Sequence, residues 1–430
     1  MKRGALALLC LVVLACARQP PAPPLAKNAR PLRDVVFART PARLARGKLL
    51  TEGLLQCFAC HSDRDWTKPG APPIVSLKGA GHVWWKKKDG WRLVAPNLTP
   101  DRATGAGTWT DDMLARAIRE GVGHDGRPLH PQMWYDTFRF LSDEDVASLV
   151  VALRALPPVS RALPPTRLTA KRYETLQGNP NMRPITAPVP EPDRSTPGSY
   201  GRYLVMVADC SGCHTAWEAP KNPGVFGGGN RIERDAGSGA ENLAVFSRNI
   251  TPDPSGIPYY DDALFIESMR TGKVRARELS PIMPWVVFRN LPDEELKAMH
   301  AFLKTVPPVA HVVDKAEADS PCAMCGQAHG GGRFNKRKRE GAVPIDEATA
   351  RALEGRYRFE DGFVLTIARE KGLLVAGGEG PPPSELLTKD GRLFFLETDA
   401  AVVEPVRDAS GQVTGLVDHA FFGLTAVRIR

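Results

Sequence analysis

The sequence predicts a mainly α-helical chain, with two tandem all-α domains followed by a small all-β, barrel-like domain. Three observations predict this fold class. Five sequence blocks occur twice in the same order, and the apolar residues of both copies recur at helical spacing. From about Ile345 onward, short alternating apolar runs are separated by turn pairs such as Asp361-Gly362. With 430 residues, of which 43% are hydrophobic, the chain is long enough for two or three domains with apolar cores.

The first residues predict export. Met-Lys-Arg precedes an apolar run, Gly4 to Ala15, which is too short to cross a bilayer as a stable helix and is typical of a secretion signal. The run ends Val-Leu-Ala-Cys16, which resembles the lipobox of bacterial lipoproteins, where cleavage precedes the cysteine and its thiol is acylated. The alternative is a plain signal peptide with an incidental Cys16. The Pro-rich residues that follow suit a flexible tether, so we expect a lipid-anchored protein of the periplasm or cell envelope.

The duplicated blocks organise the region up to residue 310. The first cysteine precedes the Asn of an Asn-x-Thr-Pro-Asp block by 40 residues in one copy (Cys57 to Asn97) and by 39 in the other (Cys210 to Asn249). Such near-equal spacing indicates a tandem duplication. The blocks are RGKLLTEGLLQCFACH, PNLTPD, WTDD, HPQMW and LSDEDVASLVVALRALPPV in the first copy, and YGRYLVMVADCSGCH, RNITPD, YYDD, SPIMPW and LPDEELKAMHAFLKTVPPV in the second.

Each copy has the pattern of a small all-α domain. An amphipathic segment leads into the cysteine pair, a second helix begins near Asp111 or Asp261, and a third opens at Ser142 with a capping-box signature. Both third helices are expected to end at Pro-Pro, because proline lacks an amide donor and clashes with the preceding turn. The predicted segments are a signal peptide (1–15), a lipid-anchored tether (16–43), the first helical domain (44–160), a linker (161–196), the second helical domain (197–310), a linker with a cysteine pair and a basic run (311–344), and the β domain (345–430).

Both copies contain Cys-x-x-Cys-His. Two thiols one helical turn apart form thioethers with the vinyl groups of a haem, and the adjacent His then lies under the iron as its proximal ligand. The alternative to haem attachment is two close disulfides, each followed by an incidental His. The motif predicts haem attachment at two sites, with covalent residues Cys57, Cys60, Cys210 and Cys213 and proximal ligands His61 and His214.

With these motifs, both units resemble class I cytochrome c domains, in the arrangement of dihaem cytochromes and of the cytochrome subunits of periplasmic alcohol and sugar-acid dehydrogenases. The resemblance implies two covalently bound haem c groups and a late Met as sixth iron ligand, and the matching residues are Met133 and Met283. These two recur at matched positions in short Pro-containing loops, whereas Met113 and Met269 do not match each other. His130 is a minor alternative ligand in the first copy.

The third cysteine pair, Cys322 and Cys325, is followed by Gly326 where the haem motif has His. In an oxidising compartment the plain prediction is a disulfide across this pair. A third haem with unusual geometry and a zinc site are the alternatives, and a zinc site with His329 would still need a fourth ligand.

The β domain resembles the small barrel-like domain that often follows serine β-lactamase-type hydrolases. No Ser-x-x-Lys nucleophile arrangement accompanies it, so we expect a binding or packing module.

The resemblance implies a protein that carries single electrons between a periplasmic donor and a respiratory acceptor and is not itself an enzyme. Expected partners are a periplasmic dehydrogenase, a respiratory oxidase or another cytochrome, and the membrane through the lipid anchor, but no nucleic acid. The net charge of +9 favours acidic partners or anionic surfaces. The alternatives are a dihaem peroxidase-like enzyme, which needs an open iron site, and a redox sensor that acts through the β domain.

Overall fold

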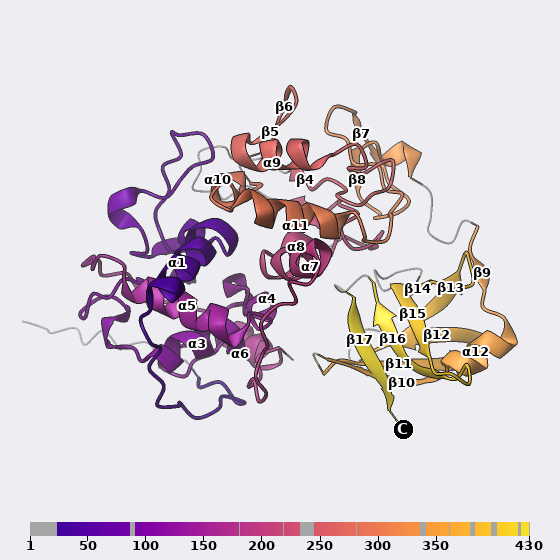
Figure 1. The fold of residues 1–430 in the computed structure, drawn as a ribbon, viewed down its shortest axis with the longest axis horizontal. Helices are drawn as coiled ribbons and strands as arrows, with labels where there is room; N and C mark the ends of the chain where they lie inside the picture. The colour runs from indigo at the N-terminus through magenta and orange to yellow at the C-terminus, as the bar shows by residue number, and fades with distance from the viewer. Residues whose placement is uncertain are drawn as a thin grey trace, which may run out of the picture.

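The computed structural model describes residues 24–86, 91–179, 181–217, 219–232, 245–280, 282–335, 341–360, 362–378, 383–396, 402–419 and 423–429. The predicted signal peptide and Cys16 lie outside these residues. Figure 1 shows a helical region, which runs from α1 to α11, and beside it a β region at the C-terminal end of the chain.

The first repeat contains the elements α1 (Pro41–Leu49), η1 (Leu50–Leu54), α2 (Cys57–Cys60), η2 (Val75–Leu77), β1 (His82–Lys86), β2 (Arg92–Ala95), η3 (Ala106–Thr108), α3 (Asp111–Glu120), η4 (Pro131–Met133), α4 (Tyr135–Phe138) and α5 (Asp143–Arg154). The second contains α7 (Pro197–Val207), α8 (Cys210–His214), β3 (Arg231–Ile232), β4 (Val245–Phe246), α9 (Asp262–Thr271), β5 (Lys273–Val274), β6 (Arg277–Glu278), α10 (Trp285–Phe288) and α11 (Asp293–Leu303). The sequence predicts two all-α repeats, but the structure adds the short strand pairs β1–β2, β3–β4 and β5–β6. They form because loop segments within each repeat pair locally.

The same helix crossing occurs in both repeats. Helix α1 crosses α5 at Gly47, where a Cβ atom would lie 1.9 Å from the carbonyl oxygen of Ser148. Helix α7 crosses α11 at Gly201, where a Cβ atom would lie 1.8 Å from the carbonyl oxygen of Ala298. Only glycine allows backbones to approach this closely. The two copies of the sequence blocks therefore fold alike at this point.

One difference in length between the repeats is absorbed by a π-helix. Ten residues lead from Gly47 to Cys57, but nine lead from Gly201 to Cys210. The extra residue falls in η1, which has π-helical geometry, whereas α7 is a regular α-helix. Because a π-turn holds one more residue than an α-turn, η1 accommodates the additional residue before the first cysteine motif.

The two repeats share one hydrophobic core. Its buried side chains come from both, among them Leu50, Leu149, Leu204 and Leu296. The short helix after each late Met contacts the other repeat, since α4 packs against α7 and α10 packs against η1. These contacts are reciprocal, as in an interface with two-fold symmetry. The repeats therefore form one helical body.

A polar cluster lies where the repeats meet. The guanidinium of Arg46 binds Asp145 of its own repeat at 2.7 Å and Glu295 of the other at 2.8 Å. The hydroxyl of Tyr203 donates to Asp145 at 2.6 Å, and that of Tyr200 donates to Glu295 at 2.7 Å. Each buried carboxylate thus has partners from both repeats, which fixes how the repeats are oriented.

The predicted flexible tether is corrected in its described part. Arg30 forms ion pairs of 2.7 Å with Asp112 and 2.8 Å with Glu120, two buried carboxylates of α3. The amide of Phe37 donates to Asp111 at the start of the same helix. Buried carboxylates need a counterion, and Arg30 supplies it, so this stretch is fastened to the first repeat.

The predicted linker between the repeats is also partly ordered. It contains helix α6 (Ala170–Gln177), whose N-cap Thr169 accepts a hydrogen bond from the amide of Arg172. Leu176 and Met182 are buried in a small core against the first repeat. The Pro-rich composition of the linker gave no indication of this helix or of these buried residues.

After α11 come β7 (Asp319–Pro321), β8 (Ala328–Gly330) and η6 (Gly332–Phe334), and then the β region. The β region comprises β9 (Val343–Pro344), α12 (Glu347–Leu353), β10 (Gly355–Phe359), β11 (Val364–Glu370), β12 (Leu373–Gly377), β13 (Ser384–Thr388), β14 (Phe394–Leu396), β15 (Val402–Arg407), β16 (Val413–Asp418) and β17 (Leu424–Ile429).

The strands of the β region form a barrel-like sheet, as predicted. The order is β12-β11-β10-β17-β16-β15-β14-β13-β9, and β12 also pairs with β13, so that eight strands form a ring. Its core includes Tyr357, Phe394 and Leu416.

Among the described residues, none of the helices has the length and apolar character needed to cross a membrane.

Candidate functional site

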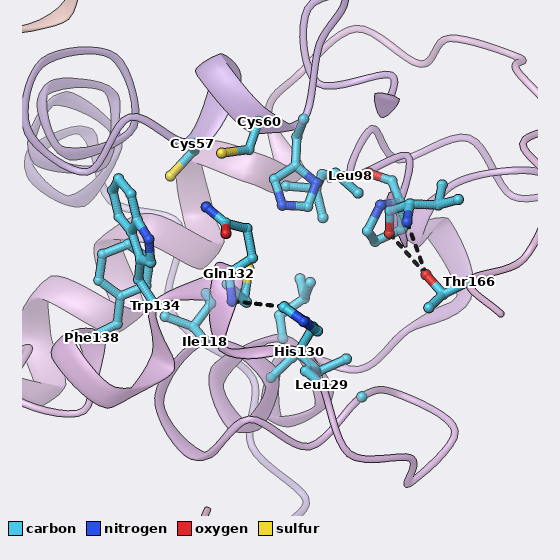
Figure 2. Close-up of a pocket in the computed structure, with 18 of the residues that line it drawn as sticks. Cys57, Cys60, Leu98, Ile118, Leu129, His130, Gln132, Trp134, Phe138 and Thr166 are labelled. Atoms are coloured by element: carbon cyan, nitrogen blue, oxygen red, sulfur yellow. Dashed lines mark hydrogen bonds between the residues drawn. The ribbon is translucent and has the colours of Figure 1, made fainter. Parts of the chain in front are cut away.

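A large cavity lies over the first cysteine motif. The cavity and its mouth together take in about 1300 Å³ of space, part of which is open solvent. Figure 2 shows the Cys57 and Cys60 sulfurs on one side of the cavity and His130 on the opposite side. Most of the other lining is apolar, including Leu55, Leu93, Leu98, Trp109, Ile118, Phe138 and Leu153. The lining suits an apolar group that can react with the two cysteine sulfurs.

The imidazole of His61 is buried and oriented in the cavity wall. Its Nδ1 lies 2.9 Å from the carbonyl oxygen of Pro96, so Nδ1–H donates and Nε2 carries the lone pair. Burial lowers the pKa of His61 to about 4, which keeps the ring neutral. A neutral imidazole with a free Nε2 lone pair is the form that binds a metal.

The second repeat builds the same arrangement. The Nδ1 of His214 donates to the carbonyl oxygen of Arg248 at 2.7 Å, and burial lowers the pKa of this ring too. Cys210 and Met283 pack against the shared core, as Cys57 and Met133 do in the first repeat. Both candidate sites therefore border the same core.

The late Met residues lie in corresponding turns of the two repeats. The amide of Met133 donates to the carbonyl of His130 at 2.9 Å, and that of Met283 donates to the carbonyl of Ser280 at 3.0 Å. Met133 lines the first cavity. The Nδ1 of His130 accepts a hydrogen bond from the Gln132 amide at 3.2 Å, so its neutral ring is protonated at Nε2. In this tautomer Nε2 of His130 has no lone pair with which to bind a metal ion.

The Asn-x-Thr-Pro-Asp blocks serve the backbone in both repeats. Asn97 donates from Nδ2 to the carbonyl of Val159 at 2.8 Å, and Thr99 accepts from the Val159 amide at 3.1 Å. Asn249 and Thr251 make the same bonds to Val309, at 2.7 and 3.1 Å. These side chains connect the loop beside His61, or beside His214, to the segment that follows the third helix of the same repeat.

The aromatic residues after the late Met correspond differently from the sequence blocks. Trp285 packs on Gly272 at the end of α9, and in the first repeat Tyr135 packs on Gly121 at the end of α3. Tyr135 is thus the counterpart of Trp285, while Trp134 lines the first cavity beside Met133. Tyr135 and Trp285 each lie two residues after the late Met of their repeat. This equal spacing in the sequence would have identified them as counterparts.

None of the six described cysteines is bonded to another. For the haem motifs, the two-disulfide alternative is therefore not formed. Burial raises the pKa of Cys57 and of Cys60 to about 12, so these thiols are not thiolates that exchange disulfides. The predicted disulfide between Cys322 and Cys325 is not formed either, and both sulfurs are buried thiols.

Sequence reasoning missed Asp209, which precedes the second motif and lies between the repeats. Its Oδ1 is 3.3 Å from Oγ1 of Thr137, which belongs to α4 of the first repeat. Burial raises the pKa of this carboxyl to about 6. Its place directly before Cys210 was visible in the sequence, but its burial against the other repeat was not.

Asp209 should make the stability of the protein depend on pH. Because its pKa is higher in the folded than in the unfolded state, the folded state binds the extra proton, and stability falls as pH rises from about 4 to above 6. We expect Asp209→Asn to match the wild type at pH 4 and to exceed it by about 2–3 kcal/mol at pH 7.5. Urea unfolding at both pH values measures this, with the exposed Asp34→Asn as control. A constant difference between variant and wild type would contradict the assignment.

Comparison with known proteins identifies proteins of similar sequence. No family model matches the chain. It is similar to the fructose dehydrogenase cytochrome subunit of Gluconobacter japonicus, with 29% identity over 273 residues, 58% of this chain and 50% of the relative. A diheme cytochrome c-type protein of Cereibacter sphaeroides is 28% identical over 282 residues, 59% of this chain and 82% of the relative. The gluconate 2-dehydrogenase cytochrome c subunit of Pantoea cypripedii is 29% identical over 180 residues, 40% of this chain and 38% of the relative.

The match thus spans half the length of the fructose dehydrogenase subunit. The relatives named above are cytochrome c subunits of dehydrogenases or a diheme cytochrome c, and none of them is named a peroxidase. The chain is therefore similar to electron-transfer cytochromes c, a likeness that supports electron transfer with covalently bound haem c.

Proposed function

We propose that this protein is a dihaem c-type cytochrome that carries single electrons between a periplasmic dehydrogenase and a respiratory acceptor, and that it catalyses no reaction of its own. The observation that carries the proposal is the duplicated Cys-x-x-Cys-His, with each His held by a backbone carbonyl so that Nε2 is left for iron. The dehydrogenase as donor is suggested by the names of the relatives.

The donor set fits haem c. Cys57 and Cys60 present two thiols for thioether bonds at the wall of an apolar cavity, beside the neutral imidazole of His61. Met133 offers a thioether from another part of the same wall. Cys210, Cys213, His214 and Met283 are the counterparts in the second repeat. When bound, haem supplies reversible one-electron chemistry at iron.

The residues of the chain set the properties of the sites. Apolar side chains such as Leu98 and Phe138 exclude water from the first cavity, which disfavours the more highly charged ferric form and raises the reduction potential. Met ligation raises it further relative to a second His. Since both sites border one core, electrons would pass between them through packed side chains rather than through solvent.

The cellular setting remains a prediction from the sequence. Acylation of Cys16 would hold the protein at a membrane facing the periplasm. The basic net charge suits an acidic docking partner. The domain boundaries at 44–160 and 197–310 remain predictions from the sequence, and we propose that the β domain is a binding or packing module.

Haem content tests the proposal. We expect two covalent haems per chain, measured by pyridine haemochrome absorbance against protein concentration. Cys60→Ala and Cys213→Ala should each halve normal attachment, because each removes a thiol from one motif only. Peptide mass mapping identifies the motif that is affected. A stoichiometry of one or three would overturn the count, and failure of the reduced protein to give electrons to a one-electron acceptor would overturn the carrier role.

A further inference from the structure

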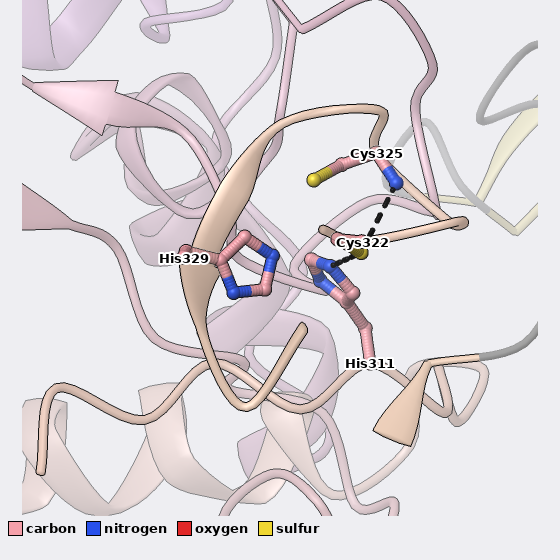
Figure 3. A group of neighbouring side chains, drawn as sticks. All are labelled: His311, Cys322, Cys325 and His329. Carbon is pink, nitrogen blue, oxygen red and sulfur yellow. Dashed lines mark hydrogen bonds between the residues drawn. The ribbon is translucent and has the colours of Figure 1, made fainter. Parts of the chain in front are cut away.

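Four side chains near the third cysteine pair converge on one point. They are His311, Cys322, Cys325 and His329, whose nitrogen and sulfur atoms all lie within 4.8 Å of one another. All four are buried, with 0–4% of each residue exposed. Figure 3 shows them facing a common centre. Both cysteines come from the turn between β7 and β8, His329 comes from β8, and His311 comes from the segment that follows α11.

The two imidazoles are both oriented by the backbone. The Nδ1 of His311 donates to the carbonyl of Gly227 at 2.7 Å, and its Nε2 lies 3.4 Å from the sulfur of Cys322. The Nδ1 of His329 donates to the carbonyl of Gly330 at 3.0 Å. A second-shell carbonyl on Nδ1 is the usual way in which proteins direct Nε2 at a metal ion.

The Nε2 of His329 is the observation that points to a ligand. It is buried, and within the described part of the chain it makes no hydrogen bond. Burying a polar atom without a hydrogen-bond partner costs free energy, so such an atom usually indicates that a water molecule or an ion binds there. Since the neighbouring atoms here are two sulfurs and another Nε2, a metal ion satisfies all four at once.

The sulfur of Cys322 is supplied with hydrogen-bond donors. The side-chain amide of Asn335 lies 3.2 Å from it, and the backbone amide of Cys325 lies 3.4 Å from it. Such N–H···S bonds stabilise negative charge on sulfur, which is the form that binds metals. The turn itself depends on Gly326, whose φ of 73° favours glycine.

We propose that His311, Cys322, Cys325 and His329 bind one zinc ion in a closed structural site. Two thiolates and two imidazoles are a donor set that tetrahedral Zn²⁺ prefers. Both thiols lose their protons to solvent as the two Zn–S bonds form, and the two Zn–N bonds use the Nε2 lone pairs. Four protein ligands leave no open position for a substrate, so the site is structural rather than catalytic.

The site would fasten the segment after α11 to the second haem motif. Gly227, which holds His311, is followed by Gly228, whose amide donates to the carbonyl of His214 at 2.7 Å. Ala216 belongs to the same buried cluster as both cysteines. Zinc would thus brace the backbone behind the proximal His of the second repeat. The zinc site itself does not depend on the proposed electron-transfer function.

Metal analysis of the full-length haem protein tests the inference. In protein purified without chelators, we expect one zinc per chain, measured by elemental mass spectrometry against protein concentration. X-ray absorption at the zinc edge should show two sulfurs at about 2.3 Å and two nitrogens at about 2.0–2.1 Å. Removal of the zinc with a chelator should lower the thermal midpoint and shift the spectrum of one haem.

Variants separate this site from adventitious zinc. Cys325→Ser and His329→Ala should lose the zinc and keep two haems. The control His419→Ala should keep the zinc as well as the two haems. His419 is the matched control, because it is an imidazole of the β region that pairs with Glu404 at 2.7 Å, away from the cluster. Iron content is read in the same samples, so a failure of the haem count is seen separately.

Three results would overturn the inference. The first is no zinc in the wild type, even after incubation with equimolar zinc under reducing conditions. The second is a Cys322–Cys325 disulfide in the native protein, found by thiol blocking and peptide mass. The third is unchanged zinc in both site variants. If either variant fails to fold, the X-ray absorption spectrum of the wild type decides, since oxygen ligands or fewer than two sulfurs would exclude this donor set.

Discussion

Replacement of Met133 or Met283 by leucine is expected to let one equivalent of carbon monoxide bind to the reduced protein, where the wild type binds little. Leucine preserves the volume of the side chain, so the fold should lose less than about 1.5 kcal/mol, but it has no thioether to occupy the sixth position of iron. The double variant should bind two equivalents. Absorbance changes in the Soret band during titration with carbon monoxide measure the stoichiometry.

The matched control is Met299→Leu. Met299 is 1% exposed in α11 and belongs to the shared core, so it tests the effect of losing a buried thioether elsewhere. It should leave carbon monoxide binding as low as in the wild type. Replacing Met133 or Met283 with His should keep six-coordination and lower the potential of that haem by on the order of 0.1 V or more. Stoichiometric carbon monoxide binding by the wild type, together with turnover of peroxide, would favour the peroxidase alternative.

The two Cys-x-x-Cys-His motifs could be recognised in the sequence because their residues are adjacent. Cys57, Cys60 and His61 need only one helical turn to come together, and the same holds for the second motif. The late Met residues could be aligned because the spacing of the repeats is nearly equal. Local patterns of this kind survive without knowledge of the tertiary fold.

Other features depend on contacts between distant residues. His311 joins Cys322 only through the path of the chain after α11, so the sequence offered three zinc ligands and no fourth. Arg30 fastens a Pro-rich stretch because Asp112 is buried, which composition alone does not reveal. The core that the repeats share could not be predicted from the sequence of either repeat, because each copy has enough apolar residues to suggest a domain with its own core.

The crossing glycines should be among the residues least tolerant of change. Gly201→Ala is expected to destabilise the protein by about 3 kcal/mol or more, because the new Cβ would lie 1.8 Å from the carbonyl oxygen of Ala298 and would force α7 away from α11. Gly47→Ala should act similarly on α1 and α5. Urea unfolding, followed by far-ultraviolet circular dichroism, gives the free energies.

Gly198→Ala is the control in the same helix. A Cβ at Gly198 would approach no atom closer than the Oγ1 of Thr196 at 4.0 Å, so this change should be neutral or stabilise by up to about 1 kcal/mol through helix propensity. Since α7 leads directly into Cys210, displacement of this helix should also reduce covalent haem at the second motif more than at the first. Equal urea midpoints for Gly201→Ala and Gly198→Ala would show that the helices do not meet at Gly201. The close crossing would then not be the contact that holds α7 and its cysteine motif in place.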